Sequence, residues 1–213
     1  KTLDYIIISH SHYDHIGAVP YLRQRWPRLK VLGASYAQKV LSKSSAQQTI
    51  RSLGQEAGGI YSSGGGIPEY DEVLLRVDET IADGDIIGLG GMDIAVLETK
   101  GHTQCSLSFM LNGEIMFASE STGYMNRAGK IVPAYIASYL DAVSSIQKCQ
   151  AMNSRRIISP HYGPVRAEDT ADYWRNCLAA AQETYDFIVA LAQKGLCEEL
   201  ILTQYEQRFR DEE

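Results

Sequence analysis

The sequence of 213 residues lacks any run of about 20 apolar residues, so we expect no membrane-spanning helix. Pairs of the Cys-x-x-Cys type are also missing. The four cysteines are widely separated: Cys105, Cys149, Cys177 and Cys197. This spacing favours reduced thiols and a cytoplasmic location. The net charge of −6 argues against nucleic acid or an anionic membrane surface as the partner.

Two classes of catalytic motif are absent as well. The glycines of residues 58–66 are not followed by Lys-Ser or Lys-Thr, and no Gly-x-Gly-x-x-Gly precedes a helix, which argues against a phosphate-binding loop. We find no convincing Ser-His-Asp or Cys-His nucleophile. Cys105 lies three residues after His102. Packing on a strand is the expectation for this thiol, and lining a pocket is the alternative.

Histidine is scarce, and three of the five histidines fall within residues 9–15, Ser-His-Ser-His-Tyr-Asp-His. The apolar run Tyr5–Ile8 before them predicts a buried strand. If the backbone stays extended through His10 and His12, both side chains point the same way and can share one metal ion. The chain then turns, so that Asp14 and His15 face a second position nearby. Exposed turn histidines are the alternative, which this density of ligand-type side chains disfavours.

The remaining ligand-type residues also follow predicted strands. His102 comes after the strand predicted at residues 92–98, and His161 after the one at 156–159. Glu120 follows a hairpin predicted over residues 106–118, which turns at Asn112-Gly113. His102 and Glu120 are therefore expected at the same edge of one sheet. Imidazole and carboxylate ligands together suit zinc, iron or manganese.

These motifs and their order resemble the metallo-β-lactamase-fold superfamily of metal-dependent hydrolases over residues 3–165. The matching pieces are His-x-His-x-Asp-His, a later Gly-His-Thr, a strand ending in an acid, and a final His before Tyr-Gly. The resemblance implies an α/β fold, a four-layer αββα sandwich. It also implies a first metal held by His10, His12 and His102, a second held by Asp14, His15 and His161, and an acidic bridge between the two.

Two departures from the family pattern stand out. The bridging acid is usually Asp, and here Glu120 occupies its place. The extra methylene lets Glu120 bridge only if its backbone lies further from the metals; otherwise it binds one metal or none. Family members also have about two strands before the motif strand, whereas this chain begins almost on it. We therefore expect that the first N-terminal strands of the fold are missing from the chain.

The domain organisation predicted is a metal-binding domain at residues 1–165 with a C-terminal helical extension at 166–213. Helices are expected at 16–25, 35–41, 133–152, 170–194 and 196–210, and further strands at 30–34, 73–77 and 86–89. Asp83-Gly84 is expected to turn a hairpin. Packing is the default role of the last two helices, with pocket closure or a homodimer as alternatives. The glycine-rich residues 42–71 predict a mobile lid that carries Tyr61, Ile67 and Tyr70.

The function implied by the resemblance is a binuclear metal-dependent hydrolase, in which a metal-bridging hydroxide attacks a small ester, lactone or thioester. Asp14 would orient the nucleophile or carry its proton. Tyr124 is a candidate donor to the developing oxyanion, with plain packing as the alternative, and Tyr162 has the same two alternatives. In glyoxalase II-like thioesterases Gly-His-Thr is often followed by Pro-Gly-His, and Gln104-Cys105-Ser106 departs from that pattern.

The cofactors expected are two divalent metal ions, zinc first, with iron and manganese next. The partner expected is a small-molecule substrate. A small phosphodiester is the closest competing substrate. Two other classes stay open: a ligand-binding or regulatory member with low turnover, which Glu120 would explain, and an iron-based redox protein.

Overall fold

The computed structural model describes residues 2–62 and 66–209. The chain divides into an N-terminal unit, Lys1–Asp85, and a C-terminal unit, Ile86–Glu213. The sheet of the N-terminal unit ends before residue 86. The helical tail belongs to the C-terminal unit.

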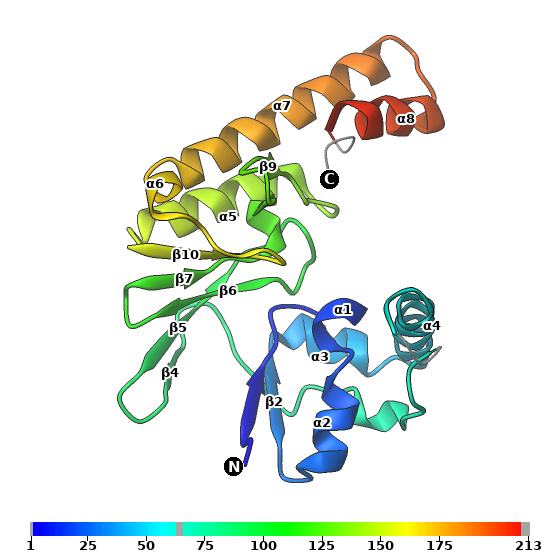
Figure 1. Ribbon diagram of the computed structural model, residues 1–213, viewed down its shortest axis with the longest axis vertical. Helices are drawn as coiled ribbons and strands as arrows, with labels where there is room; N and C mark the ends of the chain where they lie inside the picture. The colour runs from blue at the N-terminus through cyan, green and yellow to red at the C-terminus, as the bar shows by residue number, and fades with distance from the viewer. Residues whose placement is uncertain (1, 63–65, 210–213) are drawn as a thin grey trace. The chain divides into compact units, whose positions relative to one another are not determined.

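The N-terminal unit contains a parallel three-stranded sheet of order β1-β2-β3. Figure 1 shows β2 beside the dark-blue strand β1. Its strands are β1 (Tyr5–Ile7), β2 (Lys30–Gly33) and β3 (Glu79–Thr80). The apolar run at residues 5–8 therefore forms a strand as expected. Two helices follow β1, namely α1 (Tyr13–Ile16) and α2 (Val19–Arg25). A single helix was expected here, but Pro20 lies in the first turn of α2 and lacks the N–H that a continuous helix would need.

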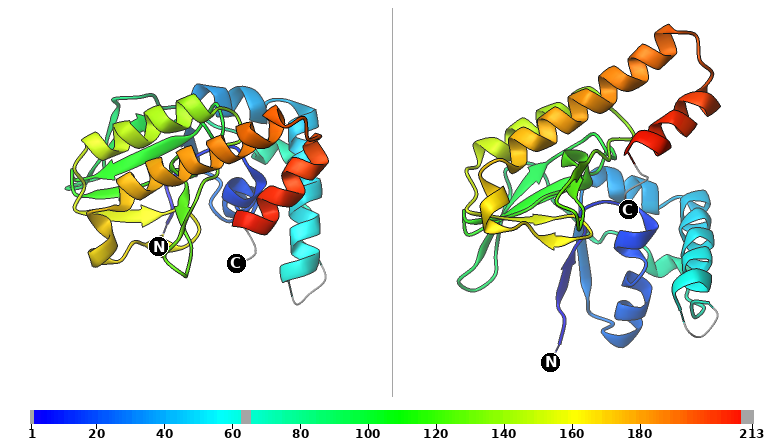
Figure 2. Two further views of the ribbon diagram at one scale, coloured as in Figure 1. Left: turned by 90° about the horizontal axis from the view of Figure 1, so that it is seen from above. Right: turned by 45° about the horizontal axis from the view of Figure 1, so that its top comes forward.

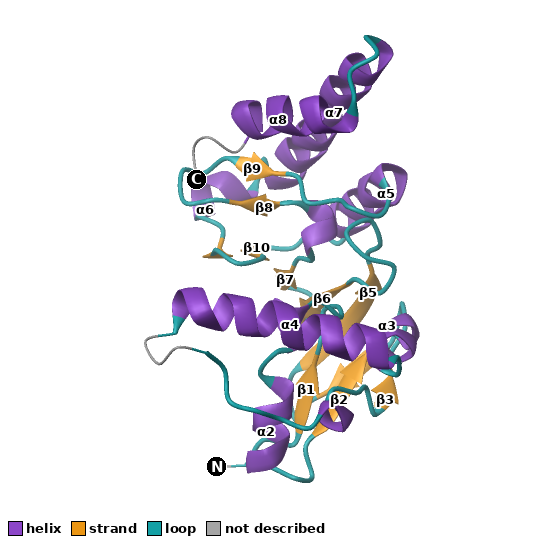
Figure 3. Ribbon diagram, turned by 90° about the vertical axis from the view of Figure 1, so that its right-hand side faces the viewer, coloured by secondary structure: helices purple, strands orange, loops and turns teal. Residues whose placement is uncertain are grey.

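Residues 42–71 are not the irregular loop that their glycines predicted. Helix α3 (Ser35–Leu41) is followed by the long helix α4 (Ser44–Tyr61), which Figure 3 shows along its length. Gly58 serves packing, since a Cβ there would lie only 2.7 Å from Cγ2 of Ile67. Each helical glycine costs about 1 kcal/mol relative to alanine, a cost that tertiary contacts of this kind offset.

The expected lid is also wrong for the residues that the structure describes. Tyr70 is buried, and its ring meets that of Tyr21 edge-on at 5.6 Å. The Arg51 guanidinium lies 4.5 Å from the centre of the Tyr70 ring. Tyr70 is therefore fixed within the N-terminal unit, while Tyr61 ends α4 with 86% of its surface exposed. Residues 63–65 of the expected lid lie outside the described residues.

The connection between the units overturns two further expectations. Residues 73–77 form no strand; a short 3-10 helix, η1 (Glu72–Leu74), precedes β3. Asp83-Gly84 joins β3 to β4 (Ile86–Gly88), and these strands belong to different sheets. The turn is real, since Asp85 Oδ2 accepts a hydrogen bond from Ala82 N at 2.7 Å. Turn residues alone do not specify whether the flanking strands pair with each other.

A six-stranded sheet of order β11-β10-β7-β6-β5-β4 forms the base of the C-terminal unit. Its other strands are β5 (Asp93–Glu98), β6 (Leu107–Leu111), β7 (Ile115–Phe117), β10 (Arg156–Ser159) and β11 (Gly163–Pro164). Strands β4 to β7 are antiparallel, and β10 joins β7 in parallel. The predicted hairpin turn is confirmed: Asn112 and Gly113 both have positive φ, at 50° and 68°.

Helices α5 (Tyr139–Ala151) and α7 (Tyr173–Gln193) lie side by side over this sheet, as both views of Figure 2 show. They enclose a core with the strands: Leu97, Met110, Met116, Ile146, Cys149, Ile157, Tyr173, Trp174, Cys177 and Ala181. Helix α5 begins at Tyr139, six residues after Pro133, where the Ser138 side chain caps it by accepting from Asp141 N. The late start leaves Ile136 and Leu140 each 75% exposed.

The smaller elements of this unit are η2 (Glu120–Thr122), the hairpin of β8 (Tyr124–Met125) and β9 (Ile131–Val132), and helices α6 (Ala167–Thr170) and α8 (Glu198–Phe209). None of the four cysteines forms a disulfide, and all four lie in the part of the chain that the structure describes. Cys149 and Cys177 are buried in the core, and burial raises the pKa of the Cys149 thiol to about 12. Among the described residues, no helix is long and apolar enough to cross a membrane.

Candidate metal centre

The N-terminal unit gathers the four ligand-type residues of the first motif. The ring centre of His10 lies 4.6 Å from that of His12 and 4.1 Å from that of His15. Asp14 Oδ2 lies 3.3 Å from His15 Nε2. Three imidazoles and one carboxylate thus form one cluster at the end of β1.

The local backbone explains this cluster. His12 stays extended, with φ −73° and ψ 151°, and caps the N-terminus of α1. Its carbonyl accepts hydrogen bonds from His15 N at 3.1 Å and Ile16 N at 3.2 Å, so the chain turns immediately after it. Ser9 Oγ lies 3.1 Å from His10 Nδ1 and 3.4 Å from His15 Nδ1, within reach of both rings. The predicted change from extended chain to turn is present within this unit.

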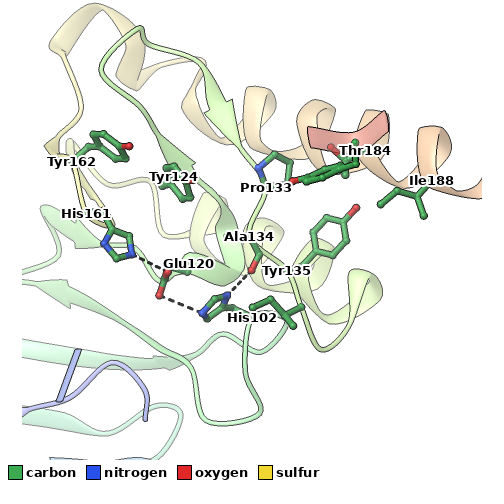
Figure 4. A pocket seen from close by; sticks show the side chains of 12 residues that line it. His102, Glu120, Tyr124, Pro133, Ala134, Tyr135, His161, Tyr162, Thr184 and Ile188 are labelled. Atoms are coloured by element: carbon green, nitrogen blue, oxygen red, sulfur yellow. Dashed lines mark hydrogen bonds and ion pairs between the residues drawn. The ribbon is translucent and has the colours of Figure 1, made fainter. Parts of the chain in front are cut away.

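In the C-terminal unit, the Glu120 carboxylate lies between two histidines (Figure 4). Its Oε1 is 2.9 Å from His161 Nε2, and its Oε2 is 3.4 Å from His102 Nε2. Glu120 is buried, with 8% of its surface exposed. Each carboxylate oxygen therefore faces a different imidazole, which is the arrangement that a bridging ligand requires.

A backbone carbonyl determines which ring nitrogen of His102 carries the proton. Its Nδ1 lies 2.5 Å from the carbonyl oxygen of Ala134, which can only accept, so Nδ1 carries the proton. Nε2 is then the nitrogen that offers a lone pair toward Glu120. Two donor atoms bound to one zinc ion at a tetrahedral angle lie roughly 3.4 Å apart. The distance from Nε2 to Oε2 fits that spacing, and histidine ligands commonly donate their other N–H to a carbonyl.

A network of buried hydroxyl groups holds the segments that carry His102 and Glu120. Thr99 Oγ1 lies 3.0 Å from Ser108 Oγ and 2.9 Å from Ser119 Oγ, and all three residues are buried. Ser121 Oγ accepts from His102 N at 2.9 Å, which ties the His102 loop to η2. Because these polar groups satisfy one another in the interior, they fix the backbone that presents the two ligands.

His161 occupies an unusual backbone conformation. Its φ is +61°, in the left-handed region that non-glycine residues seldom adopt. It lies in the tight connection between β10 and β11, where Ser159 is paired with Gly163. The conformation costs on the order of 1–2 kcal/mol and orients the imidazole toward Glu120.

A cavity of about 570 Å³ adjoins this part of the centre. Its lining comprises His102, Glu120, Tyr124, Pro133, Ala134, Tyr135, Ile136, His161, Tyr162, Thr184, Ile188 and Tyr205. Tyr124 stacks on Tyr162, with ring centres 5.5 Å apart, and lies 6.1 Å from the His161 ring. Cys105 is buried and is not among the residues that line this cavity.

Sequence reasoning missed the part of this lining that comes from α7, α8 and the segment before α5. Ile188 lies in the helix expected at residues 170–194, for which packing was the default role, and it lies on the inner face of α7. Tyr135 was expected inside a helix. Helical periodicity identifies an inward face but does not separate residues that fill a core from residues that line a cavity.

Comparison with known proteins agrees with these motifs. A model of the metallo-beta-lactamase superfamily matches residues 1–116. The hydroxyacylglutathione hydrolase of Prochlorococcus marinus is 23% identical over 155 residues, which are 72% of this chain and 48% of that protein. The metallo-beta-lactamase fold-containing protein ST1585 of Sulfurisphaera tokodaii is 22% identical over 213 residues, covering 98% of this chain and 77% of that protein.

Solved structures show the same fold. The crystal structure of ST1585 from Sulfolobus tokodaii superposes with a TM-score of 0.66 at 24% identity, covering 84% of this chain and 68% of that one. Metallo-beta-lactamase IND-7 gives a TM-score of 0.56 at 15% identity, with the same coverages. The expected fold class is confirmed. The chain spans about half the length of the hydroxyacylglutathione hydrolases that it matches. By the family model and the fold, the chain belongs to the metallo-beta-lactamase superfamily.

Proposed function

We propose that this protein is a metal-dependent hydrolase that cleaves a small ester, lactone or thioester. The observation that carries the proposal is the buried Glu120 carboxylate, which directs one oxygen to His102 and the other to His161. Such a carboxylate between two imidazoles suits a pair of divalent cations. The His10, His12, Asp14 and His15 cluster supplies the same ligand chemistry.

The residues proposed to hold the two ions are those expected from the sequence: His10, His12, His102, Asp14, His15, His161 and Glu120. Zinc is the first choice, since imidazole and carboxylate are its common ligands, with iron and manganese next. Bound ions of this kind lower the pKa of water toward neutrality and polarise the carbonyl under attack.

The side chains have distinct tasks in this proposal. Ala134 keeps the proton of His102 on Nδ1, so that Nε2 faces the centre. Asp14, exposed enough to exchange with solvent, orients the attacking water and takes its proton. The Tyr124 hydroxyl donates to the oxygen on which negative charge develops. Tyr124 lines the cavity together with Glu120 and His161, which is the observation that favours this role.

The thioester option has separate support. Several relatives are hydroxyacylglutathione hydrolases, whose name denotes hydrolysis of a thioester of glutathione. Their identities of 23% and 28% leave room for a different acyl group or thiol. Ester, lactone and thioester hydrolysis share one chemical step, attack of water on an activated carbonyl, so one centre can serve all three.

The test is turnover by the metal-containing protein on a panel of esters, lactones, thioesters and phosphodiesters. We expect hydrolysis of at least one carbonyl substrate, reduced about 100-fold or more in Glu120→Gln. The conservative variant Glu120→Asp is the matched control for charge. Hydrolysis confined to the phosphodiesters would replace the proposed substrate class. A full complement of bound metal without turnover on any substrate would instead indicate a ligand-binding or regulatory role.

A further inference from the structure

The cavity next to Glu120 extends away from the ligand residues toward α7 and α8, as Figure 4 shows for Thr184 and Ile188. Its volume of about 570 Å³ is within the range of small-molecule sites. All of its lining residues belong to the C-terminal unit. The space is therefore formed within one unit, between the centre and the two last helices.

The lining has a distinctive charge pattern. Among the described residues that line it there is no lysine or arginine, and Glu120 is the one carboxylate. Away from the ligand residues it consists of tyrosine, proline, alanine, isoleucine and threonine side chains. A carboxylate held in the part of this space away from the ligand residues would lose its hydration without a lysine or arginine beside it.

The tyrosines on the side of the cavity away from Glu120 carry no positive charge that could compensate a substrate carboxylate. Tyr135 donates its hydroxyl hydrogen to the carbonyl of Ala181 at 3.3 Å, so its polar end is directed to α7. Burial raises the pKa of Tyr135, and the ring stays neutral at physiological pH. Ile188, one turn beyond Thr184 on α7, adds a branched aliphatic surface beside it.

We propose that this cavity binds the acyl or alkyl portion of the substrate, that this portion is uncharged and aliphatic or aromatic, and that Ile188 is a specificity-determining residue. The inference rests on the proposed hydrolase function for the position of the scissile bond. It goes beyond that function in naming the substrate class. The preferred substrate is a neutral acyl derivative, and one whose acyl chain ends in a carboxylate is disfavoured.

The kinetic test compares two esters of equal length, 4-nitrophenyl butyrate and mono-4-nitrophenyl succinate. We expect kcat/KM to favour the neutral ester by about tenfold or more, after correction for the rate of each ester in buffer. Ile188 is half-buried, so Ile188→Lys can place an ammonium at the cavity wall. This variant should shift the preference toward the succinate ester by about tenfold, whereas Ile188→Met, a neutral control of similar size, should leave it unchanged.

A binding measurement keeps the inference testable without turnover. Calorimetry on the metal-containing protein would compare 3-phenylpropionohydroxamic acid with its para-carboxylate, two compounds that share a metal-chelating head and differ in the charge of the tail. Two results together support the inference even if no ester is hydrolysed: the wild-type protein binds the neutral compound more tightly, and Ile188→Lys abolishes or reverses this preference. In that case the proposed hydrolase function fails alone.

Two results would overturn the inference itself. One is turnover or binding that favours the carboxylate tail in the wild-type protein, which leaves the hydrolase function standing. The other is an equal effect of Ile188→Lys on both tails, or no binding of either hydroxamate, since a cavity that recognises a neutral group must distinguish the two.

Discussion

At the scale of single residues, His161 combines a backbone penalty with a chemical task. Its left-handed conformation persists because the β10–β11 connection is fixed by pairing at both ends, and it brings Nε2 to 2.9 Å from Glu120. Strain of this kind is concentrated where the position of a side chain matters more than local stability. One oxygen of the Glu120 carboxylate faces the His161 imidazole, and the other faces His102.

Replacing His161 by glycine and by alanine separates strain from chemistry. Both variants lose the imidazole and should lose activity and one bound metal to the same extent. Glycine adopts positive φ without a steric penalty, so His161→Gly should unfold with a free energy about 1 kcal/mol higher than His161→Ala. Urea denaturation of the two metal-free proteins measures the difference. Equal stabilities would mean that the conformation carries no strain.

Tyr124 and Tyr162 offer a matched pair of phenols, since their rings stack 19° from parallel and both line the cavity. If Tyr124 donates to the developing oxyanion, Tyr124→Phe should lower kcat about 10- to 100-fold with little change in KM. Tyr162→Phe keeps the stack and should change kcat less than about threefold. Identical small effects in both variants would assign Tyr124 to packing alone.

At the scale of secondary-structure elements, one buried ion pair joins α2 to the segment before β3. Arg23 in α2 is buried and pairs with Asp78, and Asp78 Oδ2 also accepts from Val31 N of β2 at 2.8 Å. Burial alone would raise the pKa of Asp78, but the hydrogen bonds from Arg23 and Val31 hold it below its ordinary value. The pair therefore links α2, β2 and the segment before β3 within the N-terminal unit.

Asp78→Asn should lower the free energy of unfolding by about 3 kcal/mol at pH 7, because it leaves the Arg23 charge without its counter-ion. Since the pKa of Asp78 is lowered in the folded state, its contribution is present above the unfolded value of about 3.9 and is lost as pH falls through the lowered folded value. The difference from wild type should shrink accordingly at low pH.

The control for this prediction is Glu79→Gln. Glu79 is the next residue after Asp78 in the chain, and its replacement removes an exposed ion pair with Lys30. Exposed pairs contribute about 1 kcal/mol or less, so this change should be small at every pH. Denaturant unfolding between pH 3 and pH 7 measures both variants. A pH-independent loss in Asp78→Asn would contradict the electrostatic explanation.

Helix α7 contains a hydroxyl that does not follow the pattern of the other helices. Thr49, Thr170 and Thr203 each donate to the carbonyl four residues before them. Thr184 is buried, and its Oγ1 has no hydrogen-bond partner among the described residues. Thr184→Val should therefore raise the free energy of unfolding by about 1 kcal/mol, since a buried hydroxyl without a partner is costly.

The measurement is thermal or urea unfolding, with Thr203→Val as the control for the change in side-chain shape. Thr203 is exposed and hydrogen-bonded, so its replacement should leave stability within about 0.5 kcal/mol of wild type. A loss of stability in Thr184→Val would show that the hydroxyl has a partner in solution.

At the scale of the whole molecule, the sequence predicted what depends on local pattern. The strand before His10, the hairpin at Asn112-Gly113 and the amphipathic α7 all follow from periodicity and turn chemistry. The prediction for residues 44–61 was wrong because Gly54 and Gly58 pack against Ile67, which lies beyond the helix in the chain. The prediction that the strands on either side of Asp83-Gly84 pair with each other was wrong for the same reason. Each of these strands pairs within a different sheet, with residues that lie elsewhere in the chain.

The candidate site shows the same division. The gathering of ligand-type side chains could be predicted because imidazole and carboxylate clusters have few other uses; their role as metal ligands stays a prediction. The orientation of His102 could not, because the acceptor is the carbonyl of Ala134, 32 residues further along the chain. The cavity wall on α7 and α8 likewise depends on packing that leaves space, which no residue pattern encodes.

The most direct test of the account is the metal content of the protein purified without added metal or chelator. We expect about two divalent ions per chain, zinc or next iron or manganese, falling to about one in Glu120→Gln because the carboxylate between His102 and His161 is then neutral. Elemental analysis of both proteins measures the ratio. Protein that binds no metal with all five histidines intact, or a Glu120→Gln variant that retains both ions, would contradict the proposed centre.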